Sequence, residues 1–594
     1  MNFNVLTPYV LGECVKDLKI LLFGMCQVGP MTGAPLHLNY KISHMLMGSY
    51  RHSEVPAIDI DQFDAAVIAL TLDHIIEDAT GHTFGGLHTY FETEVEFHDF
   101  LDRCESLMNE KISSLHQCLG KIPAFFVSFF EPSFDYMGNL TEKYSFRSNK
   151  YIIRKINESL YNLIRSCPNC YFVDSNDILN FVGRAQLQDD IISYSTHASF
   201  LGDVDLEENR RRLVPAKVIS ETFEVKKHEE FYGHIFWNVM EANLKILRQS
   251  DSVKLIIVDL DDTLWKGVAA ESDDDPVGRA RGWPQGFVEA LLYFKRRGGL
   301  LAICSKNERE VTLERFGRIW LGAITVDDFA SIKINRRPKS ENIVEIIEET
   351  NILPGNILFV DDDPREVNEV KSRFPAIRSL CENCLDWRRI ILRSPETQVP
   401  FVTEESVRRT ELVRARVERE SLAKTMPREE WLASLEIEQS FVLLHEADSS
   451  RFMRVLELVN KTNQFNTTGR RWTDSELREF LQSGGECLVA SLRDKTVDNG
   501  IVGAALVRTG EIVQCVLSCR IFGLGAETAM GRWATLIALR QSDCATASIV
   551  DTGKNFTCHN YFESLGFERR EEGFFTKKAC TPPPWIKVID QALP

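Results

Sequence analysis

Aspartates gather where two apolar stretches of the chain end. LIIVDLDDTLW leads from a strand-like run into Asp259 and Asp261, and ILFVDDDP ends in Asp361 and Asp362. Carboxylates packed together repel one another and lose hydration. A divalent cation with a phosphate would offset that repulsion, and oxygen ligands without nitrogen or sulfur suit Mg²⁺. The residue types therefore indicate phosphate chemistry assisted by a metal.

Two further polar positions fit a phosphate ligand. Ser305 closes the apolar stretch GLLAICS, and Lys339 comes just before a helical pattern in RRPKSENI. A hydroxyl and backbone N–H groups at a helix start suit a phosphate, and a lysine can bind a phosphoryl oxygen. Residues two apart in an extended segment share a side, so Asp259 and Asp261 can face one ligand at the carboxyl end of a strand.

These motifs, in this order, resemble the haloacid dehalogenase (HAD) superfamily of phosphohydrolases over about residues 250–395. The resemblance implies that Asp259 is the nucleophile and forms an aspartyl-phosphate. It implies that Asp261 is the general acid and then the base. Ser305 and Lys339 would hold the phosphoryl group through the transition state.

The same resemblance implies a Mg²⁺ site. Asp361 or Asp362 would hold the ion together with Asp259 and the backbone carbonyl of Asp261. The alternative is a loop of solvated aspartates without a ligand.

A narrower resemblance covers the chain from about residue 250 nearly to its end. DLDDTLWKGV, LAICSKNE, RPKSENI, FVDDDPRE, VNKTNQFNTTGRRWT and LSCRIFGLGAET resemble the FkbH-like family. Members are implicated in loading a glyceryl unit from 1,3-bisphosphoglycerate onto acyl carrier protein for polyketide and related pathways. The resemblance implies two partners, a phosphorylated three-carbon substrate and the phosphopantetheine arm of the carrier. Asp363, where the family often has asparagine, and Gly469 depart from the pattern.

Acyl transfer to a thiol raises the question of Cys304. The family has a cysteine at this position, so Cys304 is a candidate catalytic thiol. However, neighbouring strand residues point to opposite faces, so Cys304 and Ser305 should not share one pocket. A buried structural cysteine is the alternative, and the carrier's own thiol could attack directly.

The glycine-rich stretch RIFGLGA lies between an expected strand and an expected helix. Its Arg520, Gly523 and Gly525 fit R-x-x-G-x-G/A, whose backbone N–H groups can hold a pyrophosphate. Together with NYFESLGF further on, it resembles the coenzyme A loop of GNAT acyltransferases. We expect these three residues near the phosphate of a phosphopantetheine arm; the alternative is a glycine-capped turn without ligand.

The amides of Asn463, Gln464 and Asn466 in KTNQFNTTGRRW have two interpretations. They could bind a glyceryl hydroxyl or the pantetheine amides. They could equally stabilise a turn.

The first part of the chain resembles SGNH hydrolases weakly. Cys26 follows an expected strand, where that family has a serine, and His197 lies near the end of the region. Tyr194 replaces the usual acid, although Asp189 and Asp190 are close. A cysteine nucleophile with His197 is conceivable; a degenerate, docking or structural domain is the favoured alternative.

Alternating strand and helix patterns predict a multidomain α/β fold. We expect an SGNH-like three-layer domain, a Rossmann-like HAD domain, a helical connector and a GNAT-like domain. Their bounds would be 1–249, 250–395, 396–435 and 436–594. The clearest expected strands are 18–24, 64–70, 123–130, 254–258, 300–304, 357–360, 486–492, 501–507 and 511–518. The clearest expected helices are 151–164, 286–297, 340–350, 526–540 and 557–565.

Bulk composition limits the partners. The 594-residue chain carries a net charge of -17, which disfavours general binding to nucleic acid or anionic membranes. The 15 cysteines include one C-x-x-C, Cys381 and Cys384, without a second pair, which indicates reduced thiols in a cytoplasmic protein. We expect neither a membrane span nor a signal peptide.

Three functions fit these motifs. The favoured one is a glyceryl loader acting on a carrier protein, because it needs both the aspartate site and the last domain. A plain Mg²⁺-dependent phosphatase needs only the middle domain. A non-catalytic scaffold is the third, against which the intact Asp259, Asp261, Ser305 and Lys339 argue.

Overall fold

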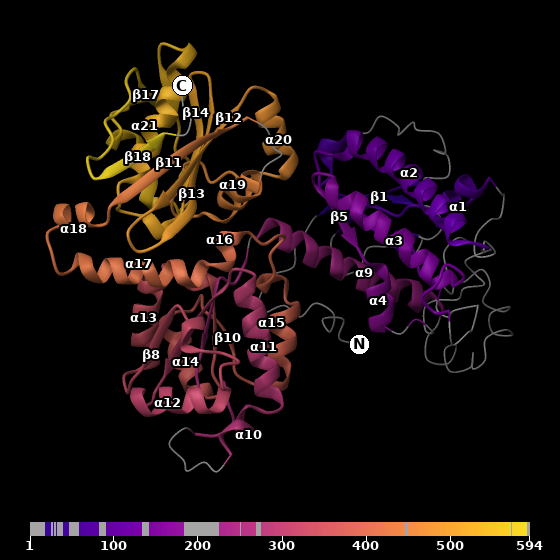
Figure 1. Cartoon of the computed structure of the whole chain (residues 1–594), viewed down its shortest axis with the longest axis horizontal. Coiled ribbons are helices and arrows are strands. Elements are labelled where there is room, and N and C mark those ends of the chain that lie inside the picture. The colour runs from indigo at the N-terminus through magenta and orange to yellow at the C-terminus, as the bar shows by residue number, and fades with distance from the viewer. Residues whose placement is uncertain are drawn as a thin grey trace. The chain divides into compact units, whose positions relative to one another are not determined.

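The structure is a computed structural model of the whole chain (Figure 1). It describes residues 18–24, 28, 31–32, 40–46, 59–81, 91–132, 142–182, 184, 225–249, 251–268, 275–445, 450–571 and 573–590. These residues form three β-sheets, each accompanied by helices, which confirms the expected multidomain α/β class. The chain divides into two compact units, mostly residues 13–241 and mostly residues 242–594.

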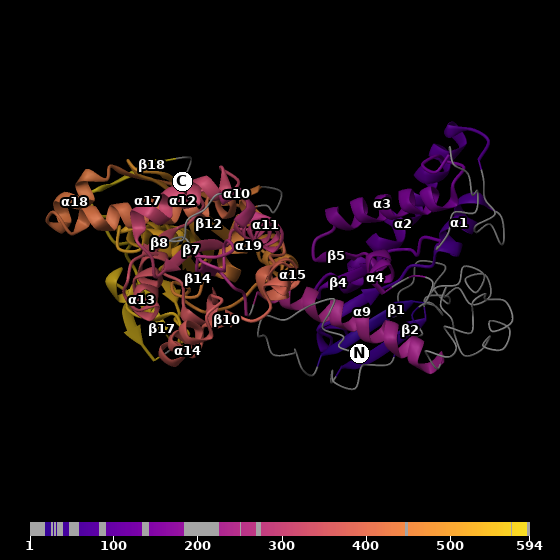
Figure 2. The ribbon, with the colours of Figure 1, turned by 90° about the horizontal axis from the view of Figure 1, so that it is seen from below.

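The first sheet is parallel, with strand order β2-β1-β3-β4-β5. Its strands are β1 (Lys19–Gly24), β2 (Lys41–Leu46), β3 (Ala65–Ile68), β4 (Ala124–Val127) and β5 (Cys170–Val173). Its helices are α1 (Leu72–Thr80), α2 (Glu94–Leu119), α3 (Asn149–Ser166), α4 (Ser175–Val182) and α9 (Val225–Arg248). Helices α1, α2 and α3 cover one face of the sheet, and α9 lies on the other (Figure 2).

The middle sheet is also parallel, with order β10-β9-β6-β7-β8. Its strands are β6 (Leu255–Val258), β7 (Leu300–Ser305), β8 (Ser331–Ile334), β9 (Ile357–Val360) and β10 (Arg378–Leu380). The chain leaves β6 towards β7 on one side and returns to β9 on the other. Such a change of direction opens a crevice at the carboxyl ends of the strands, where open α/β sheets bind ligands.

Helices bury both faces of the middle sheet, which explains the unbroken apolar run of β6. Its residues alternate between two cores: Ile256 and Val258 face one side, Leu255 and Ile257 the other. The first core is covered by α11 (Trp283–Arg296), α12 (Arg309–Trp320) and α15 (Cys384–Arg393), with the short α10 (Pro276–Ala280) nearby. The second is covered by α13 (Lys339–Thr350) and α14 (Pro364–Arg373).

Three helices connect the middle and last sheets: α16 (Glu404–Val407), α17 (Arg409–Ala423) and α18 (Arg428–Ser434). The last sheet is mostly antiparallel, with order β16-β17-β15-β14-β13-β12-β11-β18. Its strands are β11 (Ile437–Leu444), β12 (Glu486–Arg493), β13 (Asp498–Arg508), β14 (Glu511–Leu517), β15 (Ala545–Ala547), β16 (Glu568–Arg570), β17 (Gly573–Thr576) and β18 (Ile586–Asp590).

Two helical layers cover this last sheet. One core contains α19 (Ser450–Lys461) and α20 (Asp474–Gln482); the other contains α21 (Ala526–Ala538) and α22 (Tyr561–Ser564). Strand β12 serves both cores in alternation, since Cys487 and Val489 face the first while Leu488 and Ala490 face the second. Within the described residues, the structure has no helix of the length and apolarity that crossing a membrane requires.

Candidate active site

The predicted aspartates meet at the carboxyl edge of the middle sheet. Strands β6 and β9 are paired in register, with Val258 opposite Val360, so Asp259 and Asp361 follow their strands at the same level. The backbone N–H of Asp259 donates to the carbonyl of Val360 at 3.0 Å and extends the ladder by one bond. Asp259 and Asp361, which are far apart in the sequence, are thereby brought to the same edge of the sheet.

Lys339 contacts both of these aspartates. Its Nζ lies 3.0 Å from Oδ1 of Asp259 and 2.5 Å from Oδ2 of Asp361, and all three side chains are buried. Lys339 is the first residue of α13, so the helix start carries it to the strand ends. The predicted phosphoryl-binding lysine is therefore beside the predicted nucleophile.

Three carboxylates form a cluster suited to a divalent cation. One oxygen each from Asp259, Asp361 and Asp362 lies within 4.8 Å of the others. Asp362 is held by Thr263, whose hydroxyl donates to Asp362 Oδ1 at 3.2 Å and accepts from its backbone N–H at 3.2 Å. These are three of the four predicted metal-binding residues; the role of the Asp261 carbonyl stays a prediction.

The electrostatics of the cluster fit an additional positive charge. Burial raises the pKa of Asp259, and burial together with the Asp259 charge raises the pKa of Asp361 to about 7. Burial alone would lower the pKa of Lys339, but Asp259 and Asp361 outweigh it and raise the pKa. One lysine thus compensates two buried carboxylates incompletely, and Mg²⁺, a hard oxygen-binding ion, suits this donor set.

Asp261 is oriented by two donors that the sequence motifs did not assign. The indole Nε1 of Trp265 donates to its Oδ1 at 3.0 Å, and Nδ2 of Asn307 donates to its Oδ2 at 3.0 Å. Asn307 also donates to Ser305 Oγ at 3.1 Å, which joins the strand end of β7 to the network. Trp265 and Asn307 lie within the motifs DLDDTLW and CSKN, but their spacing in the sequence does not reveal that they contact Asp261.

Ser305 and Cys304 have different surroundings. Ser305 is buried at the end of β7 within the site network. Cys304 packs in the core beneath α13, where its thiol lies 3.7 Å from the backbone carbonyl of Lys339. Burial raises the pKa of the Cys304 thiol well above its usual range, which disfavours the thiolate. These contacts favour the structural interpretation of Cys304 over the catalytic one.

The glycine loop of the last domain is covered by the chain itself. Gly523 and Gly525 have positive φ angles of 77° and 87°, which explains why glycine stands at both positions. A side chain at Gly525 would meet Pro583 at 3.0 Å, and the indole of Trp585 donates to the carbonyl of Leu524 at 2.8 Å. The predicted phosphate role of these glycines stays a prediction.

Arg520 is buried rather than displayed at the loop surface. Its guanidinium donates to the carbonyls of Asn499 at 2.6 Å and Ile501 at 3.1 Å. It also borders a cavity between the middle and last domains. Its predicted contact with a pantetheine phosphate is likewise untested.

The amides of the NQFN segment have partners within the protein. Asn466 Oδ1 accepts from the Gly469 N–H at 2.9 Å and from Gln514 Nε2 at 2.7 Å. Gln464 and Asn351 exchange two amide hydrogen bonds of 3.1 Å, and Asn463 accepts from Arg471. For Asn466 the turn-stabilising interpretation fits these contacts.

The same segment fills a gap in the last sheet. Strands β14 and β15 pair only at Glu511 and Ile512. Beyond these residues Thr467 donates to the Cys515 carbonyl at 3.1 Å, and its own carbonyl accepts from Val550 at 2.8 Å. Residues 465–467 therefore bridge the diverging strands. The candidates Cys26 and His197 of the first domain, with Asp189, Asp190 and Tyr194, lie outside the described residues.

Comparisons with known proteins found distant structural likenesses. The N-terminal part of a Bacteroides fragilis protein, containing a phosphatase domain complexed with Mg, aligns at 20% identity over 66% of this chain and 97% of its own, with a TM-score of 0.41. A HAD-superfamily hydrolase from Geobacter sulfurreducens aligns at 17% identity over 22% and 89%, with a TM-score of 0.17.

A predicted HAD-like hydrolase from Porphyromonas gingivalis aligns at 17% identity over 24% of this chain and 98% of its own, with a TM-score of 0.17. No family model and no curated protein matches the chain. These likenesses carry no activity over to this chain, whose chemistry rests on its own side chains.

Proposed function

We propose that the middle domain is a Mg²⁺-dependent phosphohydrolase that uses Asp259 as its nucleophile. The observation that carries this proposal is the buried group of Asp259, Asp361 and Lys339 at the carboxyl edge of the sheet. Asp259, Asp361 and Asp362 would hold the ion, which supplies positive charge against the phosphoryl oxygens when bound. Lys339 adds a second positive charge beside Asp259, and the burial of both side chains strengthens its effect.

The protein groups account for both halves of the reaction. A carboxylate oxygen of Asp259 forms a bond to phosphorus, and the ester oxygen leaves with a proton from Asp261. Asp261 then takes a proton from water, which attacks the aspartyl-phosphate, releases inorganic phosphate and restores Asp259. Trp265 and Asn307 hold the two oxygens of Asp261 and so fix where this proton is given and taken.

The finer proposal is glyceryl loading. The support is the sequence resemblance to FkbH-like proteins together with a second α/β domain that a simple phosphatase does not need. In this proposal the substrate is 1,3-bisphosphoglycerate. The thiol of the carrier's phosphopantetheine arm displaces the phosphate at C1, and the phosphate at C3 is hydrolysed at the Asp259 site. The burial of Cys304 favours direct attack by the carrier thiol over a relay through this cysteine.

One experiment separates the two levels of the proposal. The full chain is incubated with Mg²⁺, 1,3-bisphosphoglycerate and acyl carrier protein bearing its arm, and the intact mass of the carrier is measured. A glyceryl increment that Asp259→Asn abolishes supports the loader. Phosphate release from unrelated esters without an increment supports the plain phosphatase. Phosphate release unchanged in Asp259→Asn would contradict both, and Asp262→Asn, with an exposed side chain, is the matched control.

A further inference from the structure

A cavity lies at the opposite end of the middle sheet from the aspartates. It has a volume of about 150 Å³. Lys254, Gly299 and Asn356 border it, and each stands immediately before a strand, β6, β7 or β9. Strand β6 has four residues, so about 13 Å separates the cavity from the aspartates. The remaining walls come from α16 and α17, the end of α19, and the turn that follows β14.

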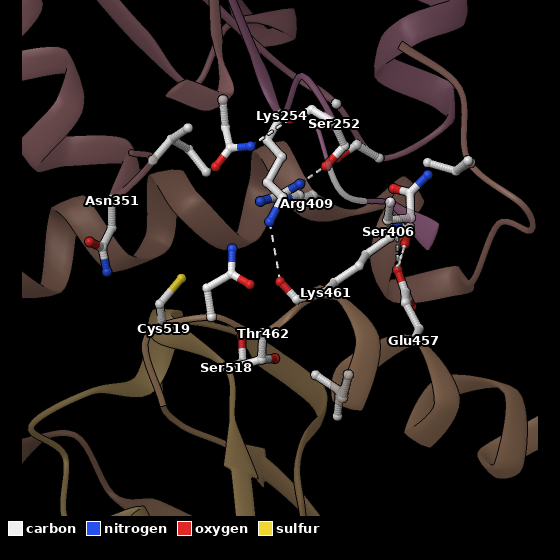
Figure 3. Close-up of a pocket in the computed structure, with 18 of the residues that line it drawn as sticks. Ser252, Lys254, Asn351, Ser406, Arg409, Glu457, Lys461, Thr462, Ser518 and Cys519 are labelled. Carbon is white, nitrogen blue, oxygen red and sulfur yellow. Dashed lines mark hydrogen bonds and ion pairs between the residues drawn. The ribbon is translucent and has the colours of Figure 1, made fainter. Parts of the chain in front are cut away.

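Positive charge dominates the lining. Six of the bordering side chains are cationic and two are carboxylates, Glu405 and Glu457; the six are Lys254, Arg297, Arg409, Arg454, Lys461 and Arg520. Figure 3 shows Lys254 and Arg409 in the middle of the cavity, with Ser518 and Cys519 on the opposite wall. The cavity therefore has a surplus of four positive charges (six minus two), although the whole chain has a net charge of -17.

The two carboxylates are already engaged. Glu457 pairs with Arg454 at 2.5 Å and Lys461 at 2.9 Å, and it accepts from the hydroxyls of Thr403 and Ser406. Glu405 lies 3.7 Å from Arg454 and accepts from a backbone N–H. Arg454 and Lys461 are thereby compensated, and the other four cations are not.

Those four cations have only neutral partners among the residues that the structure describes. Lys254 donates to the carbonyl of Lys461 at 3.2 Å, and Arg409 donates to that of Gly298 at 2.9 Å. Arg520 also bonds only carbonyls, and its buried Nε has no partner within the described chain. Arg297 likewise has a buried guanidinium nitrogen without one. Buried donors of this kind are normally satisfied.

Burial makes these charges unfavourable in the absence of a counter-charge. It lowers the pKa of Lys254 to about 7, with Arg409 as the next contributor, and that of Arg520 to about 9. Burial also lowers the pKa of Arg409. An anion placed among them would reverse the penalty and satisfy the free donors at once.

We propose that this cavity is a binding site for a dianionic phosphate group that bridges the middle domain, the connector and the last domain. Arginine and lysine together suit a phosphate, which accepts several charge-assisted hydrogen bonds. The polar side chains of Ser252, Asn356 and Ser518 offer further contacts. The group could come from inorganic phosphate or from a small phosphate monoester. The proposal does not depend on the chemistry at Asp259.

Calorimetric titration of the full chain with inorganic phosphate tests the site. EDTA is present, so that the acidic cluster has no metal with which to attract phosphate. We expect binding that weakens at least tenfold in Lys254→Met and in Arg409→Met, because each loses a charged contact. Lys371→Met, on the exposed face of α14, should bind as wild type does.

Two outcomes would overturn the proposal: wild type fails to bind phosphate in the millimolar range, or Lys254→Met, Arg409→Met and Lys371→Met all bind phosphate as well as wild type does. If Lys254→Met does not fold, Arg409→Met decides, because it removes another cation that lines the same cavity. A parallel titration with glycerol phosphate distinguishes the sources. Tighter binding of the ester assigns a monoester, and weaker binding assigns free phosphate.

Discussion

At the carboxyl end of β6, Asp259 and Asp361 share a single lysine, Lys339. At its amino end, Lys254 and Arg409 have only backbone carbonyls as partners among the described residues. The acidic end buries, and the basic end half-buries, charge that the protein itself does not balance, and the signs are opposite. Each end therefore implies an external ion, a cation at one and an anion at the other. A charge imbalance can therefore identify the kind of ligand before any ligand is seen.

The largest effect expected at the acidic end is loss of turnover in Asp259→Asn. An amide cannot act as the nucleophile, so we expect phosphate release to fall by at least about 10⁴-fold. The measurement is phosphate release under saturating Mg²⁺. Asp363→Asn is the control, since Asp363 caps α14 and pairs with the exposed Arg365. If Asp259→Asn and Asp363→Asn lost phosphate release equally, the result would contradict the assignment of Asp259 as the nucleophile.

The counter-charges that each end does possess should matter for stability. Lys339→Met leaves the buried carboxylates of Asp259 and Asp361 unpaired. Glu457→Gln removes the carboxylate partner of Lys461 and leaves Arg454 with Glu405 alone, at 3.7 Å. We expect each to lower the free energy of unfolding by about 3–5 kcal/mol, the usual effect of breaking a buried pair. Urea unfolding measures this.

The controls for these two variants are Lys333→Met and Glu345→Gln. Lys333→Met breaks its pairs with Glu345 at 2.7 Å and Glu349 at 2.6 Å, and Glu345→Gln breaks the first of these and a pair with Arg337. These pairs of the middle domain are partly exposed, so each variant should change stability by about 1 kcal/mol or less. If the buried and the partly exposed variants lost the same stability, burial would not be the reason that losing a charge partner is costly at the two ends of the sheet.

The pH dependence of Glu457→Gln has a defined sign. Burial would raise the pKa of Glu457, but Arg454 and Lys461 outweigh it and hold the pKa below its ordinary value of 4.5. A carboxylate with a lower pKa in the folded state stabilises the fold above pH 4.5 and loses this contribution as the pH falls further. The stability difference between wild type and Glu457→Gln should therefore shrink below that pH.

Neutralising Lys254 should have the opposite effect to neutralising Lys339. In buffer without phosphate, Lys254→Met removes a cation crowded by Arg409 and Lys461, so we expect a gain of about 1 kcal/mol. The pKa of Lys254 is lowered from 10.5 to about 7, so the unfolded chain binds more protons between these values. Wild type should therefore become more stable as the pH rises through this window, and the gain from the substitution should fade.

Thermal unfolding at pH 6.5, near the pKa of Lys254, and at pH 10 measures this. Phosphate at the lower pH should cancel the gain by stabilising wild type alone. A loss of stability in Lys254→Met without phosphate would show that the cation is balanced after all, and Lys371→Met should show neither effect.

The two ends of the middle sheet also differ in how well the sequence predicts them. The acidic end could be predicted because each group directly follows an apolar strand or begins a helix, as Asp259, Asp361 and Lys339 do. Local patterns of this kind fix both the element and the position of its last residue. Strands β6, β7 and β9 were expected within one residue of their bounds for the same reason.

The basic cavity could not be predicted from local patterns. Its residues run from Gln249 to Phe522 and come from strand starts, a connector and two turns that share no motif. Their proximity depends on how the middle and last domains pack. Arg520 illustrates the limit, because its glycine-rich motif predicts a phosphate near the loop but gives no sign that the side chain borders this cavity. Long-range packing, and not propensity, decides such sites.

The smallest expected effect concerns a residue inside a motif whose role only the structure revealed. Trp265→Phe removes the N–H that reaches Asp261 Oδ1 but keeps a ring against Phe316. Asp261 keeps its second donor, Asn307, so we expect kcat to fall only about three- to tenfold with KM unchanged. That split is the signature of a positioning residue, because a packing defect would not spare KM and a substrate contact would raise it.

The measurement is steady-state phosphate release by the folded variant, with its unfolding midpoint checked beside it. Trp283→Phe is the matched control. Trp283 lies in the same domain and packs edge-on against Trp387 of α15. We expect the control to keep wild-type kcat. If Trp283→Phe and Trp265→Phe slowed the reaction equally, the indole would matter through packing alone, and Asp261 would owe its orientation to Asn307.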